Sequence, residues 1–262
     1  MSSRRSPLIA FVMSCLIAGW GLVYVGRVKW ALRVAGLSYG GLVLAGALGW
    51  IASPKGIYAF FIFVMLVKLV SAIAAAVLSC RHDDAMTLPS VRFHCFYVAA
   101  LIVVTLVLLY PLRSTVFGYQ LYHVPSGSMV PTLAIDDYIV TDTRYSKPKV
   151  GDIVVYRFNG SEATKRVAAV GGDTLQIVNG DLIVNGQNLG LFFAPATQVK
   201  QAYSLNLAPL KVEADHVYLL GDNRDVSNDS RFMGQVARGD ITGKVTGIWL
   251  SKDAARIGST FE

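Results

Sequence analysis

The stretch Val124-Pro125-Ser126-Gly127-Ser128-Met129-Val130-Pro131-Thr132-Leu133 marks the point where the chain changes from long apolar runs to short alternating ones. It begins about twelve residues after the last long apolar run ends at Leu112. Gly127 allows a tight turn or a close approach to a ligand, and Pro125 and Pro131 fix φ on either side of it. A serine held in this way, just outside a membrane, has the setting of a nucleophile whose substrate arrives from the bilayer.

Charge is distributed unevenly between the two halves of the chain. Residues 1–112 hold nine Lys and Arg and two acids, whereas residues 113–262 hold fifteen of each sign. The net charge of +7 therefore belongs to the apolar half, where bases at helix ends orient spans and contact anionic lipid. This distribution argues against nucleic acid as a partner. The three cysteines also lie in the apolar half, and we interpret them as small buried hydrophobes: Cys15, Cys80 and Cys95.

Four apolar runs in the first half are long enough for a membrane-spanning helix, which needs about 20 residues. The runs are Pro7–Gly26, Val34–Ser53, Ile57–Cys80 and Phe93–Leu112. We therefore predict a membrane anchor of about four transmembrane helices over residues 1–112. Lys68 lies near the middle of the third run, and we interpret it as a lysine that faces the helix bundle or extends toward the surface.

The orientation of this anchor depends on the count of Lys and Arg on each side. With four spans and the polar half outside, five cations lie inside and four outside, and Arg4 and Arg5 argue against that orientation. A first run that lies in the interface would remove this conflict. A cleaved signal peptide over residues 1–26 would instead place the polar half in the cytoplasm. We expect the outward orientation, with the polar half outside.

The polar half, residues 113–262, has the pattern of β structure. Asn179-Gly180 is a strong turn signal, and Leu175–Val184 has the pattern of a hairpin around it. Gly, Asn, Asp and Pro separate short β-branched or aromatic runs. The half is about 150 residues, which is enough for one domain, and we predict a mostly antiparallel, partly closed β domain. The runs are 138–140, 153–156, 167–170, 175–178, 182–184 and 217–220.

A serine nucleophile needs a base, and the polar half offers two kinds. His123 would lie roughly 16 Å from Ser128 on an extended strand, so we interpret it and His216 as surface residues. Their spacing still leaves a Ser-His-Asp triad open. Lys165 opens an otherwise apolar strand, where burial could lower its pKa from about 10.4 and make the neutral amine a base. The neighbouring Arg166 points to the opposite face of the strand.

The segment Gly221–Gly234 carries three carboxylates within eight residues, which suggests a calcium site. The segment lacks the glycine and glutamate that an EF-hand loop needs at its sixth and twelfth positions. We therefore predict a polar loop without metal. Asx turns and Arg–Asp pairs would hold it, such as Asp229 with Arg231 or Arg224.

Four segments together resemble the bacterial type I signal peptidase (leader peptidase) family, in the order that the family has them. They are Pro125–Leu133, Gly151–Tyr156, Lys165–Asp173 and Gly221–Gly234. The resemblance implies a membrane-anchored serine endopeptidase on a mostly β fold, with a Ser–Lys dyad and no cofactor. Such an enzyme removes N-terminal signal peptides from exported preproteins on the outer face of the bacterial cytoplasmic membrane.

The resemblance also assigns roles to individual residues. Ser128 matches the nucleophile and Lys165 the general base. Ser126 matches a hydroxyl that would form the oxyanion hole together with the main-chain N–H of Ser128. Ser227 matches a hydroxyl that orients the lysine amine.

Further residues match supporting positions of the family. Asp229 and Arg231 match a structural ion pair near the site. Val124 and Pro125 lie where the family lines its substrate cleft. Thr164 stands at a usually aliphatic position near the pocket for the third residue before the cut.

The expected partners are preprotein signal peptides, the lipid bilayer and the translocation channel, although no motif shows contact with the channel. An extended signal peptide would add a strand to an open sheet edge. Leu189–Phe193 would either dip into the membrane interface or form a buried strand. Two other functions remain open: a processing peptidase of a conjugation or pilus system, and a non-catalytic anchored β domain that binds peptides.

Overall fold

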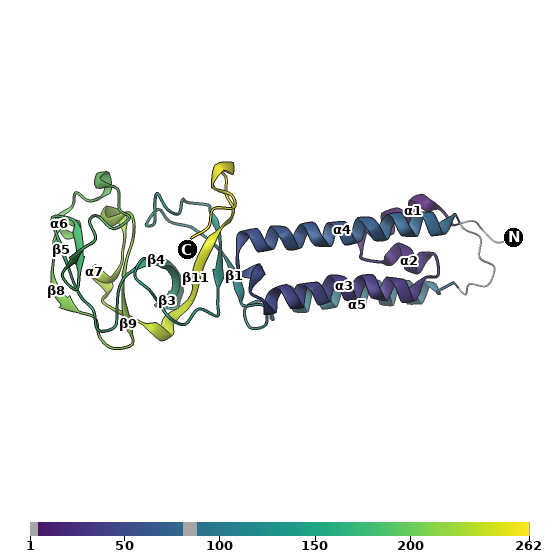
Figure 1. Ribbon diagram of the computed structural model, residues 1–262, viewed down its shortest axis with the longest axis horizontal. Helices are drawn as coiled ribbons and strands as arrows, with labels where there is room; N and C mark the ends of the chain where they lie inside the picture. The colour runs from purple at the N-terminus through teal and green to yellow at the C-terminus, as the bar shows by residue number, and fades with distance from the viewer. Residues whose placement is uncertain (1–4, 81–87, 262) are drawn as a thin grey trace. The chain divides into compact units, whose positions relative to one another are not determined.

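The computed structural model describes residues 5–80 and 88–261 (Figure 1). Contacts between residues divide the chain into two compact units. The first consists of Met1–Ile51 and Lys55–Gly118, and the second of Ala52–Pro54 and Tyr119–Glu262. The change of unit at Gly118 lies six residues from the boundary that we placed after residue 112.

The first unit is helical, and three of its helices are long and apolar enough to cross a membrane. These are α3, α4 and α5, of 20, 26 and 19 residues. The first unit contains α1 (Pro7–Leu16), α2 (Trp20–Tyr24), α3 (Val28–Ala47), most of α4 (Pro54–Ser79) and α5 (Val91–Leu109). Single 3-10 turns occur along the chain at η1 (Trp50–Ala52), η2 (Ala196–Gln198), η3 (Arg224–Val226), η4 (Arg238–Asp240) and η5 (Ala254–Arg256).

A short helical hairpin stands where we expected the first spanning helix. The run breaks after Leu16, and Gly19 turns the chain with φ of 75°. Gly21 then packs against α1: its N–H donates to Ser14 Oγ at 3.1 Å, and a Cβ built on it would overlap the carbonyl of Ala10. The ten residues of α1 rise about 15 Å, half of the roughly 30 Å of a bilayer core.

Side chains from the long helices satisfy the backbone carbonyls at the turn of this hairpin. Lys68 Nζ on α4 donates to Leu16 O at 3.1 Å, and the Tyr97 hydroxyl on α5 donates to Ala18 O at 2.7 Å. Irregular backbone at membrane depth requires such partners. Lys68 thus contacts the helix bundle, which is one of the two interpretations that its position left open.

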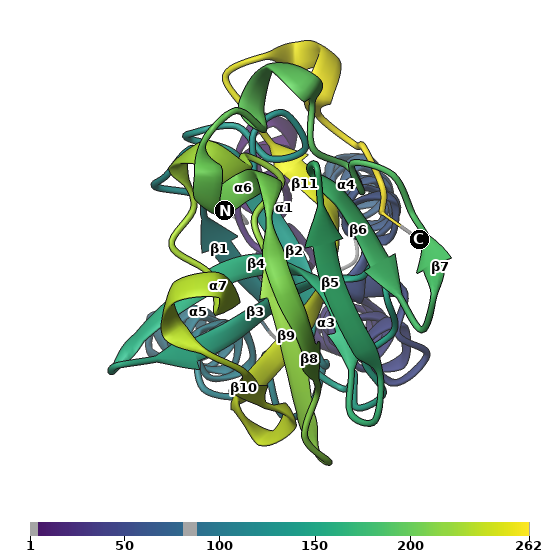
Figure 2. The same ribbon diagram turned by 90° about the vertical axis from the view of Figure 1, so that its left-hand side faces the viewer.

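The second unit is built on two antiparallel sheets, which confirms the predicted fold class of apolar helices followed by a mostly antiparallel β domain. The larger sheet has the strand order β1-β2-β11-β3-β4-β9-β10, and the smaller has the order β7-β6-β5-β8. Figure 2 shows β5 and β6 of the smaller sheet side by side. The strands are β1 (Tyr119–His123), β2 (Tyr138–Asp142), β3 (Ile153–Phe158), β4 (Ser161–Val170), β5 (Thr174–Val178), β6 (Asp181–Val184), β7 (Gln187–Asn188), β8 (Leu207–Lys211), β9 (His216–Leu220), β10 (Val236–Ala237) and β11 (Ile241–Leu250). Two short helices accompany them, α6 (Ala202–Leu205) and α7 (Ser230–Met233).

The predicted hairpin over Leu175–Val184 is present as β5 and β6. Leu175 pairs with Val184, and the turn residues Asn179 and Gly180 have φ of 51° and 91°. Positive φ at both positions explains why Asn-Gly is favoured there. The long strand β11 was not among the predicted runs, yet it pairs with both β2 and β3 near the centre of the larger sheet.

Apolar side chains form separate cores on the faces of the larger sheet. One core packs between the two sheets and joins residues of β4 and β9 to those of β5 and β6. A second core gathers Met129 and Leu133, which follow the serine turn, with residues of β2, β3 and β11. The serine turn is therefore fixed to the sheet by its own buried neighbours.

Candidate active site

Ser128 lies in the turn that follows β1, and a second loop holds this turn in place. The main-chain N–H of Asn223 donates to Ser128 O at 3.1 Å, and the Asn223 side-chain amide donates to Gly127 O at 3.1 Å. Met129, the next residue, is buried in the sheet core. The serine side chain is thus presented from a turn that is pinned on two sides.

Lys165 extends from β4 to the same place. Its amine Nζ lies 2.9 Å from Ser128 Oγ and also donates to Thr164 O at 3.0 Å. Only 5% of Lys165 and 8% of Ser128 are exposed. Burial lowers the pKa of the Lys165 amine from its ordinary value, and the opposing attraction of Asp229 and Asp222 is weaker. A buried amine at this distance is equipped to accept a proton from the serine hydroxyl.

The histidines of the polar half bond elsewhere. His123 Nε2 lies 2.8 Å from Asp136 Oδ1, and His216 Nδ1 lies 2.9 Å from Ala214 O. His123 is exposed, and His216 Nδ1 also lies 3.9 Å from Glu213 Oε2. In the described part of the chain, the basic side chain at Ser128 is a lysine.

The two other serines assigned from the resemblance differ in their surroundings. Ser126 is exposed, and its Oγ lies 3.4 Å from Ser128 Oγ. Ser227 is 5% exposed, and its Oγ has no hydrogen-bond partner among the described residues. The structure therefore contains no hydrogen bond from Ser227 to the Lys165 amine, and its orienting role stays a prediction.

The residues expected to line the substrate cleft precede Ser128 and Lys165 in the chain. Val124 is buried in the sheet core, and Pro125 beside it is exposed. Thr164 is half-buried on β4, and its carbonyl holds the amine of Lys165. Their role in substrate binding stays a prediction.

Asp229 pairs with Arg231 rather than with Arg224, so the structure selects one of the two expected ion pairs. Arg231 Nε lies 2.8 Å from Asp229 Oδ1, and both side chains are almost fully buried. Asp229 Oδ2 also accepts the N–H of Gly221 at 2.9 Å. Arg224 instead donates through Nε to Gly221 O at 2.9 Å. The pair thus fixes the loop that carries Ser227.

The other two carboxylates of this loop are also occupied by protein groups. Asp222 pairs with Arg166, and Asp225 accepts the N–H groups of Lys200 and Gln201 at 3.0 to 3.1 Å. Among the described residues, no group of three or more His, Cys, Asp or Glu could hold a metal ion. The carboxylates therefore act as structural acceptors.

Arg166, for which the sequence indicated no role, forms a second buried ion pair beside the site. Its Nε and Nη2 donate to the two oxygens of Asp222 at 2.8 and 2.7 Å, a bidentate geometry. The exposed ring of Phe193 lies 3.7 Å above its guanidinium. Phe193 belongs to a turn, so Leu189–Phe193 is not the buried strand that we considered. The sequence contained two signals for this pair: Arg166 follows Lys165 directly, and Asp222 lies at the start of the Gly221–Gly234 segment.

Comparison with known proteins identifies the family of this chain. The family model described as "Signal peptidase, peptidase S26" matches residues 95–250. Signal peptidase I of Leptolyngbya laminosa is 33% identical over 143 residues, which cover 49% of this chain and 67% of that protein. Signal peptidase I P of Bacillus subtilis subsp. natto is 32% identical over 169 residues, which cover 59% of this chain and 89% of that protein. Signal peptidase I of Pseudomonas aeruginosa is 29% identical over 187 residues, and the match covers 52% of this chain and 66% of that protein. The match therefore spans about two thirds of the length of the Leptolyngbya and Pseudomonas relatives. With more than half of its residues matched by the family model, this chain belongs to the signal peptidase family, peptidase S26, and is a serine endopeptidase.

Proposed function

We propose that this protein removes signal peptides from exported preproteins, with Ser128 as the nucleophile and Lys165 as the general base. The observation that carries the proposal is the contact of 2.9 Å between Lys165 Nζ and Ser128 Oγ in a buried setting. A neutral amine there removes the need for a histidine. Membership of the signal peptidase family supports the cleavage of signal peptides. The contact between Lys165 and Ser128 supports these two residues as the groups that carry it out.

The reaction follows from these positions in two stages. Ser128 Oγ bonds to the scissile carbonyl carbon while its proton passes to the neutral Lys165 amine. The main-chain N–H of Ser128 and the hydroxyl of Ser126 donate to the oxyanion, and one such donor is typically worth about 10²–10³ in rate. Lys165 returns the proton to the leaving amine as the carbon–nitrogen bond breaks.

The second stage releases the signal peptide. A water molecule gives a proton to Lys165 as its oxygen attacks the ester carbonyl carbon on Ser128. The ester bond then breaks, the serine oxygen recovers its proton from Lys165, and the signal peptide leaves as a carboxylic acid. The same amine therefore serves both stages, as base and then as acid.

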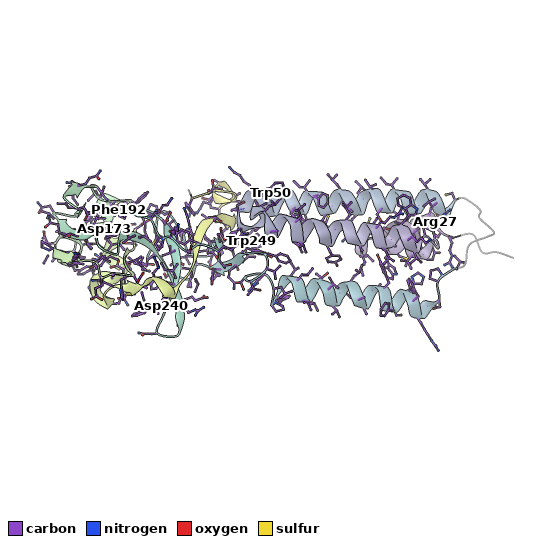
Figure 3. All side chains as sticks on the ribbon, turned by 60° about the horizontal axis from the view of Figure 1, so that its bottom comes forward. Arg27, Trp50, Asp173, Phe192, Asp240 and Trp249 are labelled. Atoms are coloured by element: carbon purple, nitrogen blue, oxygen red, sulfur yellow. The ribbon has the colours of Figure 1, made fainter. Side chains whose placement is uncertain are left out.

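The helical hairpin supports an outward orientation of the β unit. Because α1 and α2 enter and return at one end, the first unit has three crossings instead of four. Arg27 and Trp50, labelled in Figure 3, then mark opposite ends of α3. Five described cations belong to the end that holds the hairpin and two to the other end. They are Arg5, Arg27, Lys29, Arg33 and Arg92 at the first end, and Lys55 and Arg113 at the second. Arg4 and Arg81 lie outside the described residues.

The excess of cations at the hairpin end favours a cytoplasmic position for that end under the positive-inside rule. The chain leaves α5 at the opposite end and continues into β1. We therefore propose a membrane-anchored protein whose β unit lies on the outer face of the cytoplasmic membrane. Membrane anchoring would also raise the effective concentration of substrates held in the same bilayer.

The experiment that tests this function uses the full-length protein in detergent with a general secretory preprotein as substrate. We expect Ser128→Ala and Lys165→Met each to abolish cleavage, whereas Lys252→Ala, at an exposed lysine, keeps it. A serine-directed acylating inhibitor should label the wild type at Ser128 and leave Ser128→Ala unlabelled. Cleavage that survives in either dyad variant would remove the mechanism, and a wild type that cuts only pilus or conjugation substrates would remove the proposed role in general secretion.

A further inference from the structure

A cavity of about 410 Å³ lies within the helical unit. Residues of α3, α4, α5 and the turn between α1 and α2 line it, and its volume falls in the range of about 300–1,000 Å³ that ligand pockets have. On α5 the lining runs from Leu101 to Leu109, which is about 12 Å at roughly 1.5 Å per residue. Tyr97, one turn before Leu101, bonds to Ala18 O in the hairpin turn. The cavity therefore extends from the hairpin turn toward the end of α5.

Lys68 is the charged side chain among the lining residues of this cavity. Its Nζ donates to Leu16 O at 3.1 Å, and an ammonium group has three N–H donors, so two remain for another acceptor. The described part of the helical unit contains no Asp or Glu. Asp83 and Asp84, the two acids of residues 1–112, follow the end of α4 and lie outside the described residues. A lysine inside a membrane is costly unless it is paired, so this cation calls for an anion from elsewhere.

The hydroxyl groups that line the cavity already have protein partners. Thr105 Oγ1 donates to a carbonyl of α5 at 2.7 Å, and the Tyr39 hydroxyl lies 2.6 Å from Thr105 Oγ1. Ser38 Oγ donates to a carbonyl of its own helix at 3.0 Å. Among these lining groups, the donors left for a ligand belong to the Lys68 amine.

The depth of Lys68 limits which anion can reach it. The last residue of α4, Ser79, is 11 residues away, or about 16 Å, and the first, Pro54, is 14 residues away, or about 21 Å, at roughly 1.5 Å per residue. In a bilayer with a hydrocarbon core of about 30 Å, Lys68 therefore lies near the middle. The phosphate of a phospholipid belongs to the headgroup region outside this core. A phospholipid could reach Lys68 only with the end of an acyl chain.

The size of the cavity excludes a peptide helix as its occupant. A helix about 10–12 Å across with its side chains would occupy at least about 900 Å³ over a length of 12 Å, more than twice the space present. A long-chain carboxylic acid has one narrow chain and one small acidic group. It can cross hydrocarbon in its neutral form, because an acid in an apolar medium avoids its charge by keeping its proton.

We propose that this cavity binds a long-chain carboxylic acid from the bilayer, with its carboxylate at Lys68 and its chain along Val64 and Leu106. One carboxylate matches the one cation, and the apolar side chains match the chain. The site rests on the proposed membrane anchoring and does not depend on the proposed peptide cleavage. A hydrogen bond that involves a charged group corresponds to at least about a 10-fold difference in Kd.

The test uses the full-length protein in nanodiscs of zwitterionic phospholipid. Radiolabelled oleate and oleyl alcohol, which share one chain and differ in the head group, are titrated into these discs, and binding to empty discs is subtracted. Wild type should bind one oleate per protein, at least about 10-fold more tightly than oleyl alcohol. Lys68→Met should bring this ratio close to 1, whereas Lys68→Arg, which keeps the cation, should preserve the preference. Lys55→Met is the matched control at an exposed lysine in the first turn of α4 and should also preserve it.

A second pair of variants tests the cavity without removing its cation. Val64→Phe adds a ring to the lining and should weaken the binding of oleate and of oleyl alcohol alike. Val77→Phe makes the same change at an exposed position of α4 that does not line the cavity, and it should bind oleate as wild type does. Thermal unfolding of each variant in the same discs checks that the helical unit is folded.

Each outcome of these titrations decides the proposal. Equal affinity of wild type for oleate and oleyl alcohol would overturn the site, because the chain alone would then account for binding. A preference for oleate that persists in Lys68→Met, or unchanged oleate binding in Val64→Phe, would also overturn it. Wild type that does not enter the nanodiscs would overturn the site together with the proposed anchoring. Loss of oleate binding with normal cleavage of a preprotein would leave the proposed peptidase function intact.

Discussion

Lys165 and Ser128 come from segments 37 residues apart, yet the lysine amine donates to the serine hydroxyl over 2.9 Å. The contact is almost closed to solvent, since 5% of Lys165 and 8% of Ser128 are exposed. Burial disfavours a charged amine and holds the pKa of Lys165 below its ordinary value. The amine can therefore be neutral at a pH where an exposed lysine is fully charged.

The lowered pKa of Lys165 predicts how activity depends on pH. Only the neutral amine can accept the serine proton, so kcat/KM should rise with pH through the pKa of folded Lys165. The midpoint should lie below the ordinary lysine value of about 10.4. The measurement is a pH profile of kcat/KM on one preprotein. Replacing His123 and His216 with asparagine should leave this profile in place. A midpoint at the ordinary lysine value, or a profile that disappears in the histidine double variant, would contradict the proposed base.

Ser227 provides a test that separates orientation from folding. Its buried hydroxyl lacks a hydrogen-bond partner among the described residues, so Ser227→Ala should not lower the free energy of unfolding. If the hydroxyl orients the Lys165 amine during the reaction, the same change should lower kcat while KM stays constant. Thermal unfolding and steady-state kinetics on the purified protein give both quantities. Normal kcat in a stable Ser227→Ala protein would show that the hydroxyl has no orienting role.

Gly221 lies too close to the catalytic segments to carry a side chain. A Cβ at this position would overlap the side chain of Ser227 and lie 2.6 Å from Ser128 O. We therefore expect Gly221→Ala to displace the serine turn and to reduce kcat by about 10²-fold, as small misplacements in active sites do. Gly239→Ala is the matched control, because nothing lies within 4 Å of a Cβ there. Equal kcat in the two variants would show that the turn adapts freely to the added methyl group.

The Asp229–Arg231 pair predicts a difference in stability. Removing Arg231 as Arg231→Met leaves the buried Asp229 carboxylate without its cation, which should cost about 3–5 kcal/mol in the free energy of unfolding. Arg238→Met breaks the exposed pair with Asp215 and should cost less than about 1 kcal/mol. Chemical denaturation of both variants provides the comparison. Equal losses in the free energy of unfolding would mean that burial does not determine how much the Asp229–Arg231 pair contributes to stability.

Several features could be predicted from the sequence because they depend on neighbouring residues. The Asn179-Gly180 turn needs positive φ at two positions, and these residue types supply it wherever they stand. Long apolar runs predict helices that avoid water, and three of the four runs form them. The first run shows the limit of this argument, because its apolar composition suits a span and a buried hairpin equally. Only the packing of Gly21 against Ala10 distinguishes the two.

The sequence by itself determined the division into an apolar helical part and a β part, the Asn-Gly hairpin and the segments that carry the family resemblance. Each of these follows from composition or from torsion preferences within a few residues. Only the tertiary structure decided that Asp229 pairs with Arg231, that Arg166 pairs with Asp222, and that Ser227 forms no bond with Lys165. These contacts join residues that loops and strand pairing bring together, and a charge or a hydroxyl in a sequence does not indicate which partner lies within about 3 Å.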